Sequence, residues 1–542
     1  MTTATTTGQS ASIQSSSEAL VLIDGSWRPA SASGTFSATN PATGVAIAEK
    51  YPISTWSDIN TALDASVKAF EELRCLPAER IANFLELFAT KIEQSKDKLV
   101  AIANEETGLP TAPRLSDVEL PRTFNQLRAA AAATRTGSWA QATIDTKANI
   151  RSVYEGLGPV CVFGPNNFPF AFNSLAGGDF AAAIASGNPV IGKSNTSHPG
   201  TTRAFAELAW EAIEELNMPR GMVQLLYRTS HEDGEKLVSD TRVGATGYTG
   251  SRHAGLKLYE AASKAGKPFY AELSSVNPVV ILPGALKERR VKLVEDYVAS
   301  GLAAVGQMCT SPGIVLLIES PEAGSFVEEV AEKYKSAAAG TLLSRSVQQS
   351  LHRSVQSLVS FGATLVTGGE VVPGDRCALT NTILQATGKQ FLQSPENFQT
   401  EAFGNAALMV LCSDLNELHQ VLRTLEGNLT GSIYSHTGNE DDASYSVISK
   451  TLISKVGRFL NDKMPTGVAV TAAMNHGGPY PATSHPGFTA VGIPGSMLRF
   501  AKLTSYDAVR HDRLPWLLKN KNVTGKTWRS VDGQWTVSDV AS

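Results

Sequence analysis

The chain has 542 residues, of which 42% are hydrophobic and 18% are charged, as in folded globular proteins and unlike disordered chains. Its 47 Lys and Arg residues against 51 Asp and Glu residues give a formal charge of −4, so no strong basic field favours nucleic acid or an anionic membrane. No apolar run of about 18 residues occurs, which excludes a transmembrane helix. At roughly 150 residues per domain, we expect about three to four domain-sized units.

The five cysteines, spread from Cys75 to Cys412 without a CxxC pair, match neither a disulfide framework nor a zinc cluster. We therefore expect a reducing, cytoplasmic location and no metal site. Residues 1–17 are rich in Thr and Ser and lack the basic and apolar stretches of a signal peptide, which predicts a disordered tail. The stretch 521–542 is polar and forms a C-terminal tail that we expect to be poorly ordered beyond Trp528.

Between residues 160 and 275, short apolar runs alternate with segments of helical periodicity. The runs that predict buried strands are 160–163, 190–192, 223–227 and 243–246. The clearest helix lies before the third run, where apolar side chains from Phe205 to Leu216 recur at helical spacing. Successive βαβ units predict a doubly wound parallel sheet, which binds ligands outside the carboxyl ends of its strands. A nucleotide-binding domain is therefore expected.

Similar patterns continue on both sides of this region. Before it, residues 58–73 and 77–94 predict amphipathic helices. After it, a second alternating region runs from 277 to about 467, with strands predicted at 279–282, 314–318 and 407–411. The fold class is therefore α/β, with a second α/β domain after the first.

The segment from Gly250 to Gly255 follows a predicted strand and opens a predicted helix. Its backbone N–H groups and the helix N-terminus could hold an anionic group, although a tight turn that needs small residues would look the same. Leu256-Lys257 stands where an ATP-binding phosphate loop requires Lys followed by Ser or Thr. ATP hydrolysis is therefore not expected.

The second predicted strand ends at Lys193, and no acidic residue lies within four positions. Dinucleotide-binding folds place the contact to the adenosine ribose there, and an acid favours NAD. A carboxylate about 4 Å from a 2′-phosphate would cost on the order of 4 kcal/mol at an effective dielectric near 20. Because no such carboxylate is present, the site could accept the 2′-phosphate of NADP. Lys193 and Arg228 are the candidate cations for this phosphate, although either could be a solvated surface residue.

Cys309 lies between glycines at Gly306 and Gly313, ahead of a predicted strand, where its sulfur could face an open crevice. Cys161 and Cys412 lie inside apolar strand runs, as small buried hydrophobes do. Cys309 is therefore the candidate nucleophile, although a cysteine alone is weak evidence for one.

Further motifs occur around it in a fixed order: the run 157–200, Tyr248-Thr249-Gly250-Ser251, Glu272-Leu273-Ser274-Ser275-Val276-Asn277-Pro278, Gly306-Gln307-Met308-Cys309 and Glu401-Ala402-Phe403-Gly404. In order and spacing they resemble the aldehyde dehydrogenase superfamily, over nearly the whole chain from 23 to about 505. The narrower resemblance is to its NADP-linked branch of 2,5-dioxovalerate (α-ketoglutaric semialdehyde) dehydrogenases and a bacterial fatty aldehyde dehydrogenase. It is carried by the segments 163–169, 176–179, 198–201, 465–468, 476–479 and 481–484.

The resemblance implies a role for each matching residue. Cys309 would be the nucleophile, Glu272 the general base, and Asn167 an oxyanion donor together with the Cys309 backbone N–H. The cofactor-binding residues would be Lys193, Thr196, Arg228, Gly250, Ser251, Glu401 and Phe403. Because Thr196 stands where NAD-preferring relatives usually carry Glu, NADP is the expected cofactor, with NAD possible.

The implied fold has a Rossmann-like cofactor domain (18–135 and 158–276), an α/β catalytic domain (277–480) and a small β oligomerisation element (136–157 and 481–520). A homodimer or homotetramer is implied, with the strand-like stretches 139–155 and 497–503 forming intersubunit sheet. Their period-2 pattern also fits an internal hairpin.

The expected reaction is NADP-dependent oxidation of an aldehyde to a carboxylic acid through a cysteine thiohemiacetal and a thioester. The substrate 2,5-dioxovalerate leads over a fatty aldehyde or another semialdehyde, with Arg122 as the candidate partner of its carboxylate. The remaining substrate-lining residues would be Phe170, Asn173, Met308 and Thr310.

Three departures from the family pattern concern substrate shape more than chemistry: Asn166 replaces Trp, Ser274-Ser275 replaces Gly-Gly, and Met308 replaces Phe. Two other functions stay open. A catalytically silent binding scaffold would not need Cys309, Glu272 and Asn167 together, and an acylating enzyme that uses coenzyme A would not need Glu272 for deacylation.

Overall fold

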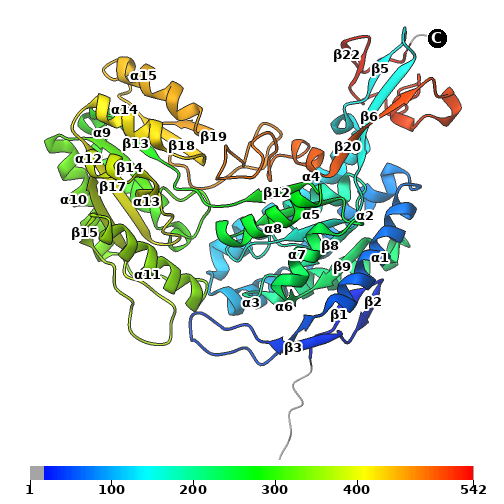
Figure 1. Cartoon of the computed structure of the whole chain (residues 1–542), viewed down its shortest axis with the longest axis horizontal. Coiled ribbons are helices and arrows are strands. Elements are labelled where there is room, and N and C mark those ends of the chain that lie inside the picture. Colours follow the sequence, from blue (N-terminus) through cyan, green and yellow to red (C-terminus); the bar gives the residue numbers. More distant parts are fainter. Residues whose placement is uncertain (1–17, 541–542) are drawn as a thin grey trace, which may run out of the picture.

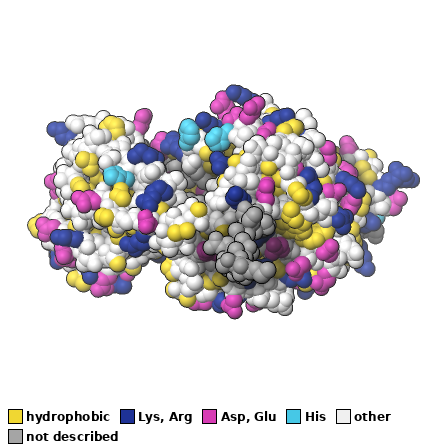
Figure 2. Space-filling model, turned by 90° about the horizontal axis from the view of Figure 1, so that it is seen from below, with side chains coloured by type: hydrophobic (Ala, Val, Ile, Leu, Met, Phe, Trp, Pro, Cys, Tyr) yellow, Lys and Arg dark blue, Asp and Glu magenta, His cyan; other side chains and the backbone are white. Residues whose placement is uncertain are grey.

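The computed structural model describes residues 18–540, which form two α/β lobes and a projecting β arm (Figure 1). The tail predicted at 1–17 lies outside the described residues. On the face seen in Figure 2, basic and acidic side chains are interspersed over both lobes, in keeping with the small formal charge. Across residues 18–540, no helix has the length and apolar character needed to cross a membrane.

The first lobe is built on a seven-stranded sheet. Its strands are β1 (Val21–Ile23), β2 (Ser26–Arg28), β7 (Val160–Phe163), β8 (Val190–Lys193), β9 (Val223–Leu226), β11 (Ala245–Thr249) and β12 (Phe269–Glu272). They lie in the order β12-β11-β7-β8-β9-β1-β2, and the first five are mutually parallel. The four predicted strands correspond to β7, β8, β9 and β11, whereas β1 and β2 add an antiparallel edge that the sequence pattern did not indicate.

Helices cover both faces of this sheet (Figure 1). They are α1 (Trp56–Leu73), α2 (Ala78–Gln94), α3 (Lys96–Thr107), α4 (Leu120–Thr136), α5 (Gly178–Ala185), α6 (Pro199–Leu216), α7 (His231–Ser239) and α8 (Arg252–Lys264). Helix α6 begins with Pro199, which suits a first helical position, and ends at Asn217 in the left-handed conformation (φ 48°). Its buried face carries Phe205 and Ile213, each worth about 1.5–3 kcal/mol of hydrophobic stabilisation.

A small sheet flanks the lobe: β3 (Ala32–Phe36), β4 (Tyr51–Ser54) and β10 (Arg228–Thr229), in the order β10-β4-β3. Strand β10 pairs in parallel with β4, so that Arg228 lies opposite Ile53. This pairing fixes the backbone of Arg228 just beyond the carboxyl end of β9.

The second lobe contains another seven-stranded sheet, in the order β15-β16-β17-β14-β13-β18-β19. The strands are β13 (Val279–Ile281), β14 (Ile314–Ile318), β15 (Thr364–Thr367), β16 (Thr382–Thr387), β17 (Ala406–Cys412), β18 (Asn428–Tyr434) and β19 (Val456–Asn461), all parallel except β15. Its helices are α9 (Pro283–Gly301), α10 (Pro321–Ser336), α11 (Arg345–Ser360), α12 (Gly388–Gln393), α13 (Pro395–Phe398), α14 (Leu415–Thr424) and α15 (Asp442–Ile453). One buried apolar cluster lies on each face of the sheet.

The arm is a five-stranded sheet in the order β20-β6-β5-β21-β22. Its strands are β5 (Thr143–Asp145), β6 (Ile150–Gly156), β20 (Ala501–Asp507), β21 (Arg529–Val531) and β22 (Gln534–Thr536). The prediction of poor order beyond Trp528 is therefore wrong for the residues that the structure describes there. Arg529, only 1% exposed, donates hydrogen bonds to the carbonyls of Lys519, Asn520 and Ser538, so a buried cation organises a segment that looks polar.

Candidate active site

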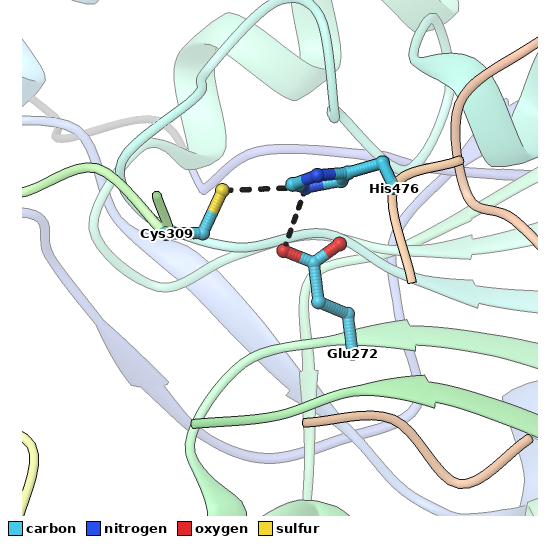
Figure 3. A group of neighbouring side chains, drawn as sticks. All are labelled: Glu272, Cys309 and His476. Carbon is cyan, nitrogen blue, oxygen red and sulfur yellow. Dashed lines mark hydrogen bonds and ion pairs between the residues drawn. The ribbon is translucent and has the colours of Figure 1, made fainter. Parts of the chain in front are cut away.

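Three side chains from distant parts of the chain converge between the lobes (Figure 3). Cys309 Sγ lies 3.3 Å from His476 Nε2, and the same nitrogen lies 3.0 Å from Glu272 Oε1. His476 and Glu272 are buried, at 2% and 3% exposure, while Cys309 is half-buried. The arrangement joins a nucleophile, an imidazole and a carboxylate, which is a set able to move a proton to and from sulfur.

Backbone contacts bring Glu272 and His476 together. Glu272 is the last residue of β12, and the segment that follows His476 is held against this strand end. Leu273 N–H donates to the Ala482 carbonyl at 2.8 Å, and Glu272 forms an isolated antiparallel bridge with Thr483. The second lobe's C-terminal segment therefore carries the imidazole back to the first lobe's sheet.

The cysteine loop has a constrained backbone. Ala304 and Val305 adopt φ angles of 49° and 60°, which are uncommon for any residue with a side chain and more so for a β-branched one. At Gly306 (φ 66°) an added Cβ would lie 2.1 Å from the Gly404 carbonyl oxygen, so only glycine fits. Beyond the turn, Asn277 donates its amide to the Cys309 carbonyl at 2.8 Å, which fixes the nucleophile's own peptide group.

The surroundings of Cys309 favour the neutral thiol. Burial, and next the negative charge of Glu272, raise the pKa of Cys309 well above its ordinary value. Because the thiolate is the nucleophile, attack requires transfer of the thiol proton to a neighbouring base. His476 Nε2 contacts both the sulfur and the carboxylate, so it is placed to pass that proton on.

Asn167 lies beside the cysteine, where it is buried and held by several contacts. Its side-chain amide donates one hydrogen bond to the Gln307 carbonyl at 2.9 Å, which leaves its second N–H for another acceptor. Arg114 donates to the Asn167 carbonyl at 2.9 Å and forms an ion pair with the buried Glu119. Glu119 in turn accepts the backbone N–H of Phe170 at 2.8 Å, so this pair anchors the loop that carries Asn167.

Arg122, on α4, faces the same centre. Its Nε and Nη2 are buried and lack a hydrogen-bond partner among the described residues. Its guanidinium lies 5.1 Å from the Phe172 ring centroid and 5.7 Å from that of Phe168. Burial lowers the pKa of Arg122, opposed in part by the nearby Cys309, but an arginine remains charged. A buried cation with free donors next to a nucleophile is suited to an anionic ligand.

Two predicted substrate-lining residues face elsewhere. Phe170 is fully buried in the core of the first lobe, where its ring packs edge-on against Phe205. Asn173 is also fully buried, and its amide donates to the Pro169 carbonyl and to Thr202 Oγ1. Phe168 and Phe172, in the same loop, take the positions near Arg122 instead, because the loop alternates its side chains between the core and the site. Thr310 is buried directly after the cysteine.

A cavity of about 510 Å³ opens at the carboxyl ends of β7, β8 and β11. Five of the seven predicted cofactor residues line it: Lys193, Thr196, Arg228, Gly250 and Ser251. Ser251 caps α8 by accepting the Ala254 N–H, and the N-terminus of this helix opens into the cavity. The cavity lies where such sheets bind dinucleotides, and the helix N-terminus at its wall can hold a phosphate.

The remaining two predicted cofactor residues, Glu401 and Phe403, lie on the side of the second lobe. They line a small cavity of about 30 Å³ together with Met308. Burial raises the pKa of Glu401 to about 7, while contacts to Ser274 and Ser275 oppose this rise. Ser274 thus interacts with this carboxylate, where the family usually has glycine.

Sequence reasoning assigned no role to three residues of the site. His476 lies 167 positions from Cys309 in a glycine- and proline-rich run, and no spacing rule connects the two. Arg114 and Glu119 lie in the π-helix Thr111–Glu119, for which the sequence suggested no functional role. The one available signal was that the resemblance included the His476-Gly477-Gly478-Pro479 segment.

The comparisons identify the class of protein. The family model described as "Aldehyde dehydrogenase family" matches residues 27–458. The chain belongs to this family, whose members are NAD(P)-dependent oxidoreductases that act on aldehydes.

Its curated relatives are more specific. The chain is 36% identical over 518 residues to "Alpha-ketoglutaric semialdehyde dehydrogenase 2" of Azospirillum brasilense, covering 92% of this chain and 96% of the relative. It is 33% identical to "Alpha-ketoglutaric semialdehyde dehydrogenase" of Acinetobacter baylyi, covering 89% and 92%. Among solved structures, lactaldehyde dehydrogenase from Escherichia coli matches with a TM-score of 0.77 at 21% identity, covering 90% and 98%. This last likeness concerns the fold alone.

Proposed function

We propose that the protein oxidises 2,5-dioxovalerate to 2-oxoglutarate with NADP as its preferred cofactor. The observation that supports this choice of substrate is Arg122, whose buried guanidinium has two unpaired donor groups beside the candidate nucleophile. A forked guanidinium binds a carboxylate in bidentate fashion, and 2,5-dioxovalerate carries a carboxylate at the end opposite its aldehyde. The names of the two similar relatives support the same choice.

In the first half-reaction, Cys309 is the proposed nucleophile. Its thiol proton passes to His476 Nε2, and the thiolate adds to the aldehyde carbon. The second amide N–H of Asn167 and the Cys309 backbone N–H donate to the resulting oxyanion. Removing one such donor typically costs about 2.7–4 kcal/mol of transition-state stabilisation. The anchoring of the Asn167 loop by Arg114 and Glu119 keeps that donor in place before substrate arrives.

The thioester formed on Cys309 is hydrolysed in the second half-reaction. Glu272 removes a proton from water, which attacks the thioester carbon and releases the acid and the thiolate. The 3.0 Å contact to His476 lets the imidazole take up and return protons at Glu272 Oε1. A single carboxylate with an imidazole beside it can thus serve both half-reactions.

A bound dinucleotide would supply the hydride acceptor for this oxidation. The residues proposed to hold it are Lys193 and Arg228 near the 2′-phosphate, Gly250 and Ser251 at the pyrophosphate, and Glu401 and Phe403 at the nicotinamide end. Thr196 carries no charge and therefore does not repel a 2′-phosphate. The carboxylate of Glu235 also lines the cavity, but it is exposed to solvent, which screens its charge. The two cations support NADP over NAD.

Steady-state kinetics with each aldehyde and each cofactor tests the proposal. We expect kcat/KM for 2,5-dioxovalerate to exceed that for every member of a hexanal-to-dodecanal series. An apolar cluster around Phe168, Phe172 and Met308 favours a fatty aldehyde as the second candidate, since each buried methylene would add about 0.8 kcal/mol. A steady rise with chain length that overtakes the keto acid would replace the first candidate by the second.

We also propose a homodimer or homotetramer. The arm projects from the first lobe (Figure 1), and its outer strand β20 pairs with β6 on one side, leaving its other edge without a partner among the described strands. Such an edge is suited to pairing with another chain. Sedimentation analysis tests this assembly, and a monomer would contradict it.

A further inference from the structure

The three side chains at the centre of the site also have the composition and spacing of a metal-ligand set. Cys309 Sγ, His476 Nε2 and a Glu272 carboxylate oxygen all lie within 4.8 Å of one another. Zn²⁺ binds sulfur at about 2.3 Å and imidazole nitrogen or carboxylate oxygen at about 2.0–2.2 Å, so neighbouring ligands of a tetrahedral ion lie roughly 3.3–3.6 Å apart. The observed separations of 3.3 Å and 3.0 Å need only small shifts to reach these values.

We propose that Zn²⁺ binds between Cys309, His476 and Glu272 and reversibly inhibits the enzyme by occupying its nucleophile. The fourth position of the ion would be left to water, as in zinc sites that keep one open coordination position. This site does not depend on which aldehyde is the substrate. It depends on His476, because without the imidazole only two protein ligands remain.

Charge and unsatisfied polar groups support the site. The thiolate and the carboxylate together balance the double positive charge of the ion, whereas the nearby Arg122 guanidinium opposes its binding. Glu272 Oε2 has no hydrogen-bond partner in the described chain, although its side chain is only 3% exposed. An ion bound by both carboxylate oxygens would give Oε2 a partner while Oε1 stays close to His476.

The ligand types also predict which ions bind. Sulfur and imidazole favour Zn²⁺, Co²⁺ and Cd²⁺ over Mg²⁺ and Ca²⁺, which prefer all-oxygen sites. The ion must displace the thiol proton, because the thiolate is the form of cysteine that binds metals. Each bound ion should release about one proton.

Titration of the full-length protein with Zn²⁺ and with Co²⁺ tests the proposal. We expect one ion per chain, calorimetric proton release, protection of Cys309 from iodoacetamide, and a Co²⁺ spectrum with thiolate charge-transfer and tetrahedral d–d bands. His476→Ala should weaken binding by at least about 100-fold and remove the charge-transfer band, while dinucleotide binding stays unchanged. Mg²⁺ should give neither protection nor inhibition.

A matched control is available at His436, a half-buried histidine whose Nε2 lies 3.9 Å from carboxylates of both Glu288 and Glu440. His436→Ala should leave stoichiometric Zn²⁺ binding and inhibition intact. Equal Zn²⁺ affinity in His476→Ala and the unmodified protein, or a Co²⁺ complex without a thiolate band, would overturn the proposal. Aldehyde oxidation without Zn²⁺ binding would reject the metal site alone, whereas Zn²⁺ binding without oxidation would reject the proposed function alone.

Discussion

Replacing Arg122 by Leu removes the charge that we propose binds the substrate carboxylate and leaves a shorter, apolar side chain. The guanidinium offers two buried nitrogen donors, Nε and Nη2, which have no partner among the described residues. A hydrogen bond to a charged group contributes about 1.5–3 kcal/mol, so a bidentate pair should contribute at least about 3 kcal/mol. At 1.36 kcal/mol for each tenfold change, this corresponds to a loss of roughly 150-fold in kcat/KM for 2,5-dioxovalerate.

The assay compares the keto acid with pentanal, which has the same chain length and no charge. Arg122→Leu should raise KM for the keto acid and change kcat/KM for pentanal by less than about threefold. Arg122→Lys keeps the charge but loses the planar fork, so it should recover part of the keto-acid activity. Because the two donors are unpaired in the free protein, thermal unfolding should show no loss of stability in Arg122→Leu.

Two results would refute this reasoning. Equal losses of kcat/KM for the keto acid and for pentanal would mean that Arg122 supports the catalytic loop, for instance by packing on the rings of Phe168 and Phe172. Unchanged kcat/KM for both would mean that the substrate carboxylate is bound elsewhere.

The remaining predictions concern catalysis and the cofactor. Cys309→Ala should abolish aldehyde oxidation with little change in dinucleotide binding by fluorescence; residual activity within about tenfold, or about 1.4 kcal/mol, would contradict its role. Glu272→Gln should give a stoichiometric burst of reduced cofactor and then slow turnover, because deacylation needs the base; an unchanged steady state would assign water activation to another group. Thr196→Glu should weaken NADP binding by on the order of a few kcal/mol and NAD binding much less, and equal losses would place the ribose elsewhere. Burial, with Arg228 nearby, lowers the pKa of Lys193 to about 8, so its charge is present below pH 8 and lost above it. NADPH binding should therefore weaken more than NADH binding as the pH rises from about 7 to 9, and parallel titration curves would argue against a contact between Lys193 and the 2′-phosphate.

Apolar patterning predicted the central strands well because these are buried on both faces. Val160–Phe163 and Ile314–Ile318 match the predicted runs to the residue. The pattern missed Asn428–Tyr434, which is equally buried but alternates polar residues with apolar ones. Inside the fold, Asn428 Oδ1 accepts the Val276 N–H and Thr430 donates to Asn277. Such tertiary hydrogen bonds are invisible to a hydropathy pattern.

In the site, too, some residues could be found from local sequence patterns and others only from tertiary contacts. Cys309 and Glu272 lie in local motifs that can be recognised in the sequence, whereas His476 reaches them through tertiary backbone contacts such as the bridge between Glu272 and Thr483. The placement of Phe170 in the core, with Phe168 and Phe172 near Arg122, was not predictable for another reason. A loop has no fixed side-chain period, so the sequence could not say which aromatic residue faces the core.

The shared nitrogen of His476 links the two half-reactions. In the free protein Nε2 contacts both Cys309 Sγ and Glu272 Oε1, yet it can hold only one proton. Once the sulfur is acylated it no longer exchanges a proton, and Glu272 is the partner left to the imidazole. The thiol proton that Nε2 took up in the first half-reaction leaves to solvent, and a proton that Glu272 takes from water can then pass to Nε2 and return to sulfur when the thioester breaks. On this reasoning, loss of the imidazole should slow both half-reactions, whereas loss of the carboxylate should slow mainly the second.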